Sequence, residues 1–426
     1  MSQKLYDELN DKVSGYEHDS RLIKPGQLFF ALKGTQADGH DFLKQVAMHK
    51  AYGAVVNKNY QSLDFGLQLF YVEDPLKAMH KMAHQKMKSL DTKVIAVTGS
   101  VGKTTSKEYI AHLLKSSYKI FWSPGNYNSQ IMIPITLLNA PADKEYFVLE
   151  YGMGDMQDIE NLVRVAPPHA ALLTKITYAH ISHFPKGLEG IAKEKTKIFS
   201  HPRTKIKVFN YDILNIRPEL KGITYSLFNK SADYYYDLDK KVFFEYQKKI
   251  QGLDLPSLPS HFLENAIGSI AMARQFQIDW ATIQHNILSL PQMENRFFKK
   301  QIAGIELIED YYNANIESMS AALDNIPNPK KKGRKIALLG EMLELGQYSS
   351  SCHEKVFQKA LKSVDHLFLL GSVWQPYHLP ENAHLFFDKK MLVQNLKTFL
   401  QPDDILLVKA SRGIQMEDVV SELFGG

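Results

Sequence analysis

The chain has little cysteine and no long hydrophobic run. Its one cysteine, Cys352, cannot form an internal disulfide, which agrees with a reducing compartment, and we interpret it as a spectator rather than a nucleophile. Nowhere do about 18 apolar residues follow one another, which argues against a transmembrane helix. The first residues, MSQKLYDELNDKV, are too polar for a signal peptide. We therefore expect a cytoplasmic protein without stable membrane insertion.

An excess of charge of one sign is also missing. The 51 basic and 46 acidic residues leave a formal charge of +5, which gives no reason to expect a nucleic-acid partner but suits small anionic substrates. The densest basic run, residues 330–335, follows two prolines and precedes the apolar run IALLG. That pattern indicates a solvated loop entering a strand.

Apolar residues are plentiful enough for more than one core. They make up 44% of 426 residues, and single cores stop growing at roughly 250–300 residues. Residues 1–90 contain short apolar runs between turns and close in a polar helix, which predicts a small mixed α/β domain. Residues 91–297 predict an α/β domain around a mainly parallel sheet, and residues 298–426 predict a second, Rossmann-like one. The predicted fold class is α/β in three domains.

The segment KVIAVTGSVGKTTSKEYIAHLL joins an apolar strand, a glycine-bearing turn and a periodic helix. Backbone N–H groups of such a turn, together with the helix N-terminus, bind phosphates. In this reading Lys103 reaches the β- and γ-phosphates of ATP and Thr104 binds Mg²⁺. The longer form of the pattern has a glycine where Val97 stands, so the match is to the shorter form, and a chance match in a loop is the alternative. The predicted nucleotide-binding residues here are Gly99, Ser100, Gly102, Lys103, Thr104 and Thr105.

Two further side chains follow predicted strands of the same domain. Glu150 ends the apolar strand FVLE, at the edge where α/β sheets place their sites, and a carboxylate is a suitable Mg²⁺ ligand. His180 follows the next strand in TYAHISHF, and His183 competes with it. An ordinary strand-ending carboxylate and a structural histidine are the alternative interpretations.

These segments belong to a longer ordered set. Nine motifs occur in the order found in the Mur ligases: TGSVGKTT, GNYNSQIMIP, VLEYGM, ITYAHISHF, GLEGIAKEKTKIF, ENRF, EDYYNAN, GEMLELG and KASRG. Near the N-terminus, DSRLIKPGQLFFAL and ADGHDF resemble the UDP-substrate domain of that family. The chain thus resembles the Mur ligase family along essentially its whole length, and most of all the branch that adds D-alanyl-D-alanine to UDP-N-acetylmuramoyl-tripeptide.

The resemblance implies a metal and reaction centre in the central domain. Thr104, Glu150, His180 and a carbamylated Lys195 would hold two Mg²⁺ ions, because a carbamate turns the lysine cation into an oxygen ligand. Lys193 and Lys197 are the alternatives to Lys195 in the run AKEKTK. The implied catalytic set is Lys103, Asn126, Asn128, Glu150, His180 and Lys195.

The resemblance also implies binding residues. Asn265 would meet the adenine, Arg296 the nucleotide phosphates and Asp310 the ribose. The residues implied to contact substrate from the C-terminal domain are Asn313, Asn315, Lys409, Ser411 and Arg412. Those implied to bind the UDP-sugar are Ser20, Arg21, Asp38 and His40, although Asp38 with Gly39 also reads as a simple turn.

The implied activity is that of a monomeric ATP-dependent ligase in peptidoglycan precursor synthesis. It would form an amide through an acyl phosphate and release ADP and phosphate. Departures from the family pattern stand at Ser129, Met132, Phe262, Ile316, Glu341 and Ala410. None of them removes a proposed metal or phosphate ligand, and together they indicate a divergent branch of the family.

Two other interpretations stay open. One is a related ligase with another acceptor, although the DNPR motif of the diaminopimelate-adding branch is missing and folylpolyglutamate synthetases lack this type of first domain. The other is a non-catalytic nucleotide-binding protein. A GTPase is disfavoured because neither Asn-Lys pair continues into the base-reading NKxD motif.

Overall fold

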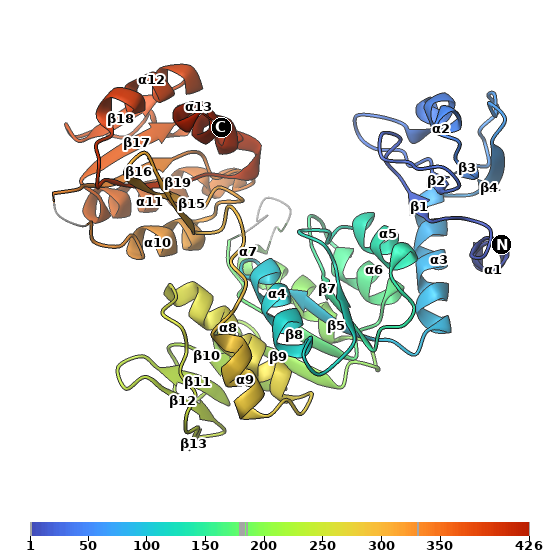
Figure 1. Ribbon diagram of the computed structural model, residues 1–426, viewed down its shortest axis with the longest axis horizontal. Helices are drawn as coiled ribbons and strands as arrows, with labels where there is room; N and C mark the ends of the chain where they lie inside the picture. Colours follow the sequence, from blue (N-terminus) through green and yellow to red (C-terminus); the bar gives the residue numbers. More distant parts are fainter. Residues whose placement is uncertain (1, 179–183, 185, 330–331, 426) are drawn as a thin grey trace.

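The computed structural model describes residues 2–178, 184, 186–329 and 332–425, and it contains three β-sheets, each with its own helices (Figure 1). The sheets use residues 16–72, 93–249 and 298–409. The predicted three-domain α/β class is confirmed. Within the described residues, no helix combines the length and the apolar character that a membrane span requires.

The N-terminal sheet has four parallel strands in sequence order, which the sequence did not predict. Its strands are β1 (Tyr16–Glu17), β2 (Leu28–Phe30), β3 (Gly53–Asn57) and β4 (Gln68–Val72). Side chains alternate across the sheet: Phe29 packs with α2 (Leu43–Met48), while Leu28 and Phe30 join the core that includes α1 (Ser2–Leu9) and α3 (Pro75–Ser89). The sheet is therefore covered on both faces.

Helix α3 connects this domain to the central one (Figure 1). It begins at an N-cap, where the Asp74 carboxylate accepts from the Lys77 N–H and Pro75 takes the first turn. Three of its basic side chains then contact backbone carbonyls of the central domain. These contacts are His80 Nε2 to Gln130 O at 2.6 Å, His84 Nδ1 to Val165 O at 3.0 Å, and Lys86 Nζ to Leu138 O at 2.9 Å and Ala140 O at 2.6 Å.

The central sheet has nine strands, in the order β13-β12-β11-β10-β9-β8-β5-β7-β6. All pairs among β5 to β11 are parallel, and β12 runs opposite to its two neighbours, β11 and β13. The strands are β5 (Lys93–Thr98), β6 (Ile120–Trp122), β7 (Tyr146–Glu150), β8 (Ala170–Leu173), β9 (Ile206–Asn210), β10 (Ile223–Ser226), β11 (Tyr234–Asp237), β12 (Val242–Glu245) and β13 (Lys248–Lys249).

Helices cover both faces of this sheet. Val94 and Ala96 of β5 face the core shared with α3, α5 (Met132–Asn139), α6 (Asp158–Val165) and α7 (Gly187–Lys195). Ile95 and Val97 face the core shared with α4 (Lys103–Leu114), α8 (Ser260–Arg274) and α9 (Trp280–Ile287). Because β5 lies between β7 and β8, its carboxyl end places the glycine turn beside the ends of these two parallel strands.

The C-terminal sheet has six strands, in the order β14-β15-β19-β16-β17-β18, with only β14 antiparallel. Its strands are β14 (Phe298–Ile302), β15 (Ile305–Glu309), β16 (Lys335–Leu339), β17 (His366–Leu370), β18 (Ala383–Phe386) and β19 (Ile405–Lys409). Helices α10 (Ile316–Asp324) and α11 (Ser349–Ser363) pack on one face, and α12 (Lys389–Phe399) and α13 (Met416–Phe424) on the other. Cys352 is buried in the α10–α11 core, where burial raises the pKa of its thiol.

Candidate active site

The glycine turn after β5 packs tightly against its neighbours. Gly102 has φ +78°, and a Cβ there would lie 2.3 Å from Asn265 Oδ1 of α8. Gly99 has φ +155°, and a Cβ there would lie 1.8 Å from Thr174 Oγ1. Only glycine therefore fits at both positions, and the turn leads into the N-terminus of the 12-residue helix α4.

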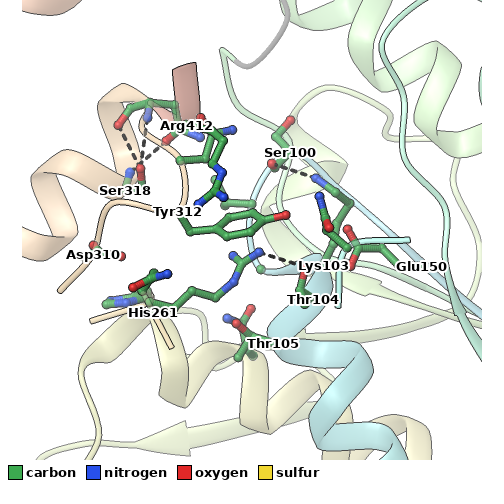
Figure 2. Close-up of a pocket in the computed structure, with 18 of the residues that line it drawn as sticks. Ser100, Lys103, Thr104, Thr105, Glu150, His261, Asp310, Tyr312, Ser318 and Arg412 are labelled. Atoms are coloured by element: carbon green, nitrogen blue, oxygen red, sulfur yellow. Dashed lines mark hydrogen bonds between the residues drawn. The ribbon is translucent and has the colours of Figure 1, made fainter. Parts of the chain in front are cut away.

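Lys103 and Thr104 open helix α4 at the wall of a cavity (Figure 2). The Lys103 ammonium donates to the carbonyls of Gly99 at 3.0 Å and Ser100 at 3.2 Å, and burial lowers the pKa of this lysine. Thr104 Oγ1 donates to Glu150 Oε2 at 2.6 Å. The predicted pair of Thr104 and Glu150 is thus in direct contact.

Glu150 ends β7 with an almost fully buried side chain. Asn128 Nδ2 donates to its other oxygen, Oε1, at 2.7 Å. Asn126 lies two residues earlier, on an exposed turn that lines the same cavity. The structure therefore brings both predicted asparagines to the cavity, and Asn128 contacts the carboxylate directly.

The three candidate lysines of α7 and its end point in different directions. Lys195 is 1% exposed, and its Nζ donates to the Gly99 carbonyl at 2.9 Å. Burial, with the nearby charge of Lys103 adding to it, holds the pKa of Lys195 well below its usual value. Lys193 is exposed, and Lys197 forms ion pairs with Glu194 and Glu160 at 2.8 and 3.2 Å. Of these lysines, Lys195 is the one that contacts the phosphate loop.

The metal set cannot be completed from the described residues. His180 and its competitor His183 lie outside them. In the ranges that the structure describes, no group of three or more His, Cys, Asp or Glu side chains is placed to hold a metal ion.

A cavity of about 690 Å³ lies between the central and C-terminal domains, beside this centre. Phosphate-loop residues form one wall, and Tyr312 and Arg412 face them from the other (Figure 2). The Arg296 guanidinium lies 3.9 Å from the centre of the Tyr312 ring and donates to Thr104 Oγ1 at 3.0 Å, so it spans the two walls. The predicted residues that line this cavity are Ser100, Gly102, Lys103, Thr104, Thr105, Asn126, Asn128, Glu150, Asn265, Arg296, Asp310, Asn313, Asn315, Lys409 and Arg412.

Sequence reasoning missed two rings of this cavity. Tyr312 follows Asp310 after β15, and His261 stands at the start of α8 against Phe262, with ring centres 4.2 Å apart. Burial lowers the pKa of His261 to about 3, so the imidazole is neutral. The only signal for Tyr312 was its place inside the motif EDYYNAN, between residues that were assigned roles.

Asp310 and Lys409 form a buried ion pair at the cavity wall. Lys409 Nζ lies 2.9 Å from Asp310 Oδ2 and also donates to the carbonyls of Asp310 at 3.1 Å and Asn313 at 3.0 Å. Lys409 is 1% exposed, and burial lowers its pKa while it raises the pKa of Asp310. The lysine therefore has three partners inside the C-terminal domain.

Other predicted substrate residues also have structural partners. Ser411 Oγ accepts from the Leu343 N–H at 2.9 Å and does not line the cavity. Asn315 caps helix α10 in a reciprocal pair with Ser318. Arg412 is exposed and forms a 3.2 Å ion pair with Glu417. The bonds of Asn315 and Arg412 hold these two side chains at the cavity wall.

A second cavity, of about 730 Å³, lies against the N-terminal domain. Asp38, His40 and Tyr60 line it together with Ile131 of the central domain. The Asn57 N–H donates to His40 Nε2 at 2.9 Å, so the proton sits on His40 Nδ1, which lies 2.6 Å from Asp38 Oδ1.

Ser20 and Arg21 are not among the residues that line this second cavity. Ser20 is buried against Gln45, and Arg21 is exposed and pairs with Asp19 at 2.6 Å. The four residues predicted to act together are therefore divided into two pairs.

Family models match three parts of the chain. Residues 97–273 match the Mur ligase middle domain, residues 295–412 match the model described as Mur ligase, glutamate ligase domain, and residues 12–86 match the model described as Mur ligase family, catalytic domain. The UDP-N-acetylmuramoyl-tripeptide–D-alanyl-D-alanine ligase of Synechocystis sp. is 33% identical over 95% of this chain and 90% of its own length. The chain belongs to the Mur ligase family.

Further Mur ligases share its full length. The ligase of the same name from Escherichia coli is 30% identical over 99% of this chain and 97% of its own. The crystal structure of MurF ligase from Thermotoga maritima in complex with ADP superposes with a TM-score of 0.84 at 25% identity, over 98% of both chains. A MurF structure from Acinetobacter baumannii has a TM-score of 0.83 at 23% identity and supports the fold.

Proposed function

We propose that this Mur ligase joins D-alanyl-D-alanine to UDP-N-acetylmuramoyl-tripeptide at the expense of ATP. The observation that carries the proposal is the cavity between the central and C-terminal domains. On one side, Lys103 and Thr104 stand beside Glu150 at a helix N-terminus, and on the other Arg296 and Asp310 close the wall. Full-length relatives named for this reaction support the choice of substrates.

The chemistry follows from the charges around the cavity. A carboxylate becomes reactive toward an amine once ATP has phosphorylated it, and the amine then displaces phosphate to form the amide. Lys103 and Arg296 place two cations where negative charge spreads during phosphoryl transfer. Asn126 and Asn128 offer amide groups beside the transferring phosphoryl group, where the acceptor carboxylate would sit.

The donor set fits Mg²⁺ if Lys195 is carbamylated. Thr104 and Glu150 are hard oxygen donors in contact with each other, and His180 belongs to the proposed set. A buried lysine with a lowered pKa supplies the neutral amine that attacks CO₂, which forms the N–C bond of a carbamate and releases one proton. Two Mg²⁺ ions bound there would neutralise phosphate charge and polarise the reacting oxygens.

The N-terminal cavity is the proposed site for the UDP end of the acceptor. His40 is held in one tautomer by the Asp38 carboxylate and the Asn57 N–H, and the Tyr60 ring stacks on it at 5.4 Å. A fixed aromatic pair beside polar side chains suits a uracil ring and its sugar. Ser20 and Arg21 would reach the ligand only from outside this cavity.

The test is a reaction with purified protein, ATP, Mg²⁺ and UDP-N-acetylmuramoyl-tripeptide, with and without D-alanyl-D-alanine. Phosphate release is measured together with the mass of the product. The expected result is phosphate release and a dipeptide-extended product only when both substrates are present. Lys103→Ala is the control for contaminating activity, because it removes the phosphate-facing cation and should abolish both signals.

A second outcome would redirect the assignment. Phosphate release without the extended product would mean that the ligase uses another acceptor or amine. No release despite tight ATP binding would count against a ligase and favour a nucleotide-binding protein.

A further inference from the structure

A lysine of helix α4 that is not part of the phosphate loop is fully buried. Lys107 lies one turn after Lys103, and its side chain is 0% exposed. Its Nζ donates to the carbonyls of Ser123 and Gly125, the latter at 2.6 Å, and lies 3.0 Å from Glu108 Oε1. An ammonium group has three N–H donors, and all three are used here.

Segment 123–128, which Lys107 contacts, carries both asparagines of the active site. At one end the Glu150 N–H donates to Ser123 Oγ at 3.3 Å, and at the other Asn128 Nδ2 donates to Glu150 Oε1. Between these ends the backbone turns, with the Tyr127 N–H bonded to the Pro124 carbonyl at 3.0 Å, and the turn is exposed. Lys107 is the side chain that reaches from the phosphate-loop helix to the inside of this turn.

The same stretch of chain continues to the second cavity. The Gln130 carbonyl meets His80 of helix α3, and Ile131 lines the N-terminal cavity. The chain from Ser123 to Ile131 therefore passes from the nucleotide cavity to the proposed UDP end. An acceptor that spans both cavities would lie along it.

We propose that Lys107 is a positioning residue that sets the distance between the phosphate loop and the acceptor side of the active site. This inference rests on the proposed function. Burying an ammonium is expensive, and an apolar side chain of similar volume often stabilises a fold as well or better. The charge of Lys107 strengthens its hydrogen bonds to the Ser123 and Gly125 carbonyls, and these bonds hold the exposed turn against the interior of the domain.

Lys86 offers a matched comparison within the same chain. It is also a buried lysine, 8% exposed, and its Nζ also donates to two carbonyls, those of Leu138 and Ala140. Those carbonyls lie at the end of helix α5, and neither Lys86 nor its partners line the nucleotide cavity or the N-terminal cavity. Lys107→Met and Lys86→Met therefore remove similar interactions at different places.

The experiment compares both variants with the parent protein in three measurements. These are thermal stability, ATP affinity, and the kcat and KM for UDP-N-acetylmuramoyl-tripeptide. For Lys107→Met we expect kcat/KM for the acceptor to fall by about 100-fold, the cost typical of a displacement of about 1 Å in a reacting centre, with ATP affinity kept. For Lys86→Met we expect lower stability and acceptor kinetics like those of the parent.

Hydrogen exchange locates the change, and a third variant checks it. Lys107→Met should speed amide exchange in segment 123–128, and Lys86→Met should speed it near Ala140. Lys107→Gln keeps two N–H donors and should recover part of the acceptor kcat/KM. If Lys107→Met does not fold, Lys107→Gln takes its place in every comparison.

Two results would overturn the proposal. One is an acceptor kcat/KM of Lys107→Met equal to that of the parent, and the other is the same kinetic loss in Lys86→Met at equal loss of stability. If the parent itself forms no extended product, the proposed function has failed instead. The parent reaction therefore separates the two failures.

Discussion

Replacing Lys409 by methionine should destabilise the C-terminal domain strongly. The substitution keeps most of the apolar volume but removes the cation from Asp310 and leaves that buried carboxylate without its 2.9 Å partner. Breaking a buried ion pair from one side costs about 3–5 kcal/mol. It also releases the carbonyls of Asp310 and Asn313, which anchor the cavity wall after β15.

The tryptophans of this chain allow the C-terminal domain to be followed alone. Of three in the sequence, Trp374 is fully buried in the C-terminal domain, whereas Trp122 and Trp280 belong to the central domain. In a Trp122→Phe, Trp280→Phe background, urea unfolding followed by tryptophan fluorescence reports the C-terminal domain alone. Lys409→Met should lower its free energy of unfolding by about 3–5 kcal/mol.

Asp310→Asn and the double variant test whether the charges cause the loss. Asparagine keeps an oxygen acceptor, so the single change should cost less, and the double variant should cost less than the sum by up to about 3 kcal/mol. A loss below about 1 kcal/mol for Lys409→Met, or strictly additive losses, would refute the reasoning from buried charge.

Three further changes probe the active site. Lys195→Met should lower ligase activity by about 100-fold or more, since even the residues that hold a metal ligand in place contribute up to about that factor. Initial rates should show that parent protein stripped of CO₂ regains activity when bicarbonate is added, and that the variant does not. Gly102→Ala should weaken ATP binding by about tenfold, because a non-glycine residue at φ +78° costs about 1–2 kcal/mol and its Cβ displaces Asn265; calorimetric titration measures this, and unchanged affinity would contradict the packing argument. His261 stays neutral in the folded protein down to about pH 3, whereas in the unfolded chain it takes up a proton near pH 6.5. Its contribution to stability is therefore complete above pH 6.5 and falls by about 1.4 kcal/mol per pH unit below that. Urea unfolding between pH 7 and 5 should show a smaller fall in the free energy of unfolding for His261→Phe than for the parent.

The sequence predicted the elements whose signal is local. The strand, glycine turn and helix around Lys103 are recognisable from adjacent residues, and Glu150 could be assigned because a parallel strand ends at the same sheet edge. The three-domain α/β class followed from alternating strand and helix patterns. The antiparallel pairings of β12 with β11 and with β13 were missed, because β12 has only four residues and β13 only two, which is too short for a strand pattern to stand out.

The partners of the site residues could not be read from the sequence. Lys409 donates to the carbonyls of Asp310 and Asn313, which lie nearly 100 residues earlier in the sequence, and Ser411 accepts from the Leu343 N–H, which lies 68 residues earlier. Such contacts depend on which strands become neighbours in the sheet, here β15 with β19 for Lys409 and β16 with β19 for Ser411. Lys107 carried only a weak signal, because a lysine four residues after Lys103 in a helix is as easily read as a solvated side chain.

Helix α3 has a consequence for which acceptors can react. In Figure 1 the helix runs beside the central domain. Its 15 residues extend about 22 Å, and the side chains of His80 and His84 bond it to backbone carbonyls of that domain. The N-terminal cavity is thus held at a set separation from the phosphate loop. In the proposed reaction this fixed distance selects the length of the acceptor. With the UDP end bound in the N-terminal cavity, the carboxylate of a shorter peptide would not reach ATP, and that of a longer peptide would extend beyond it.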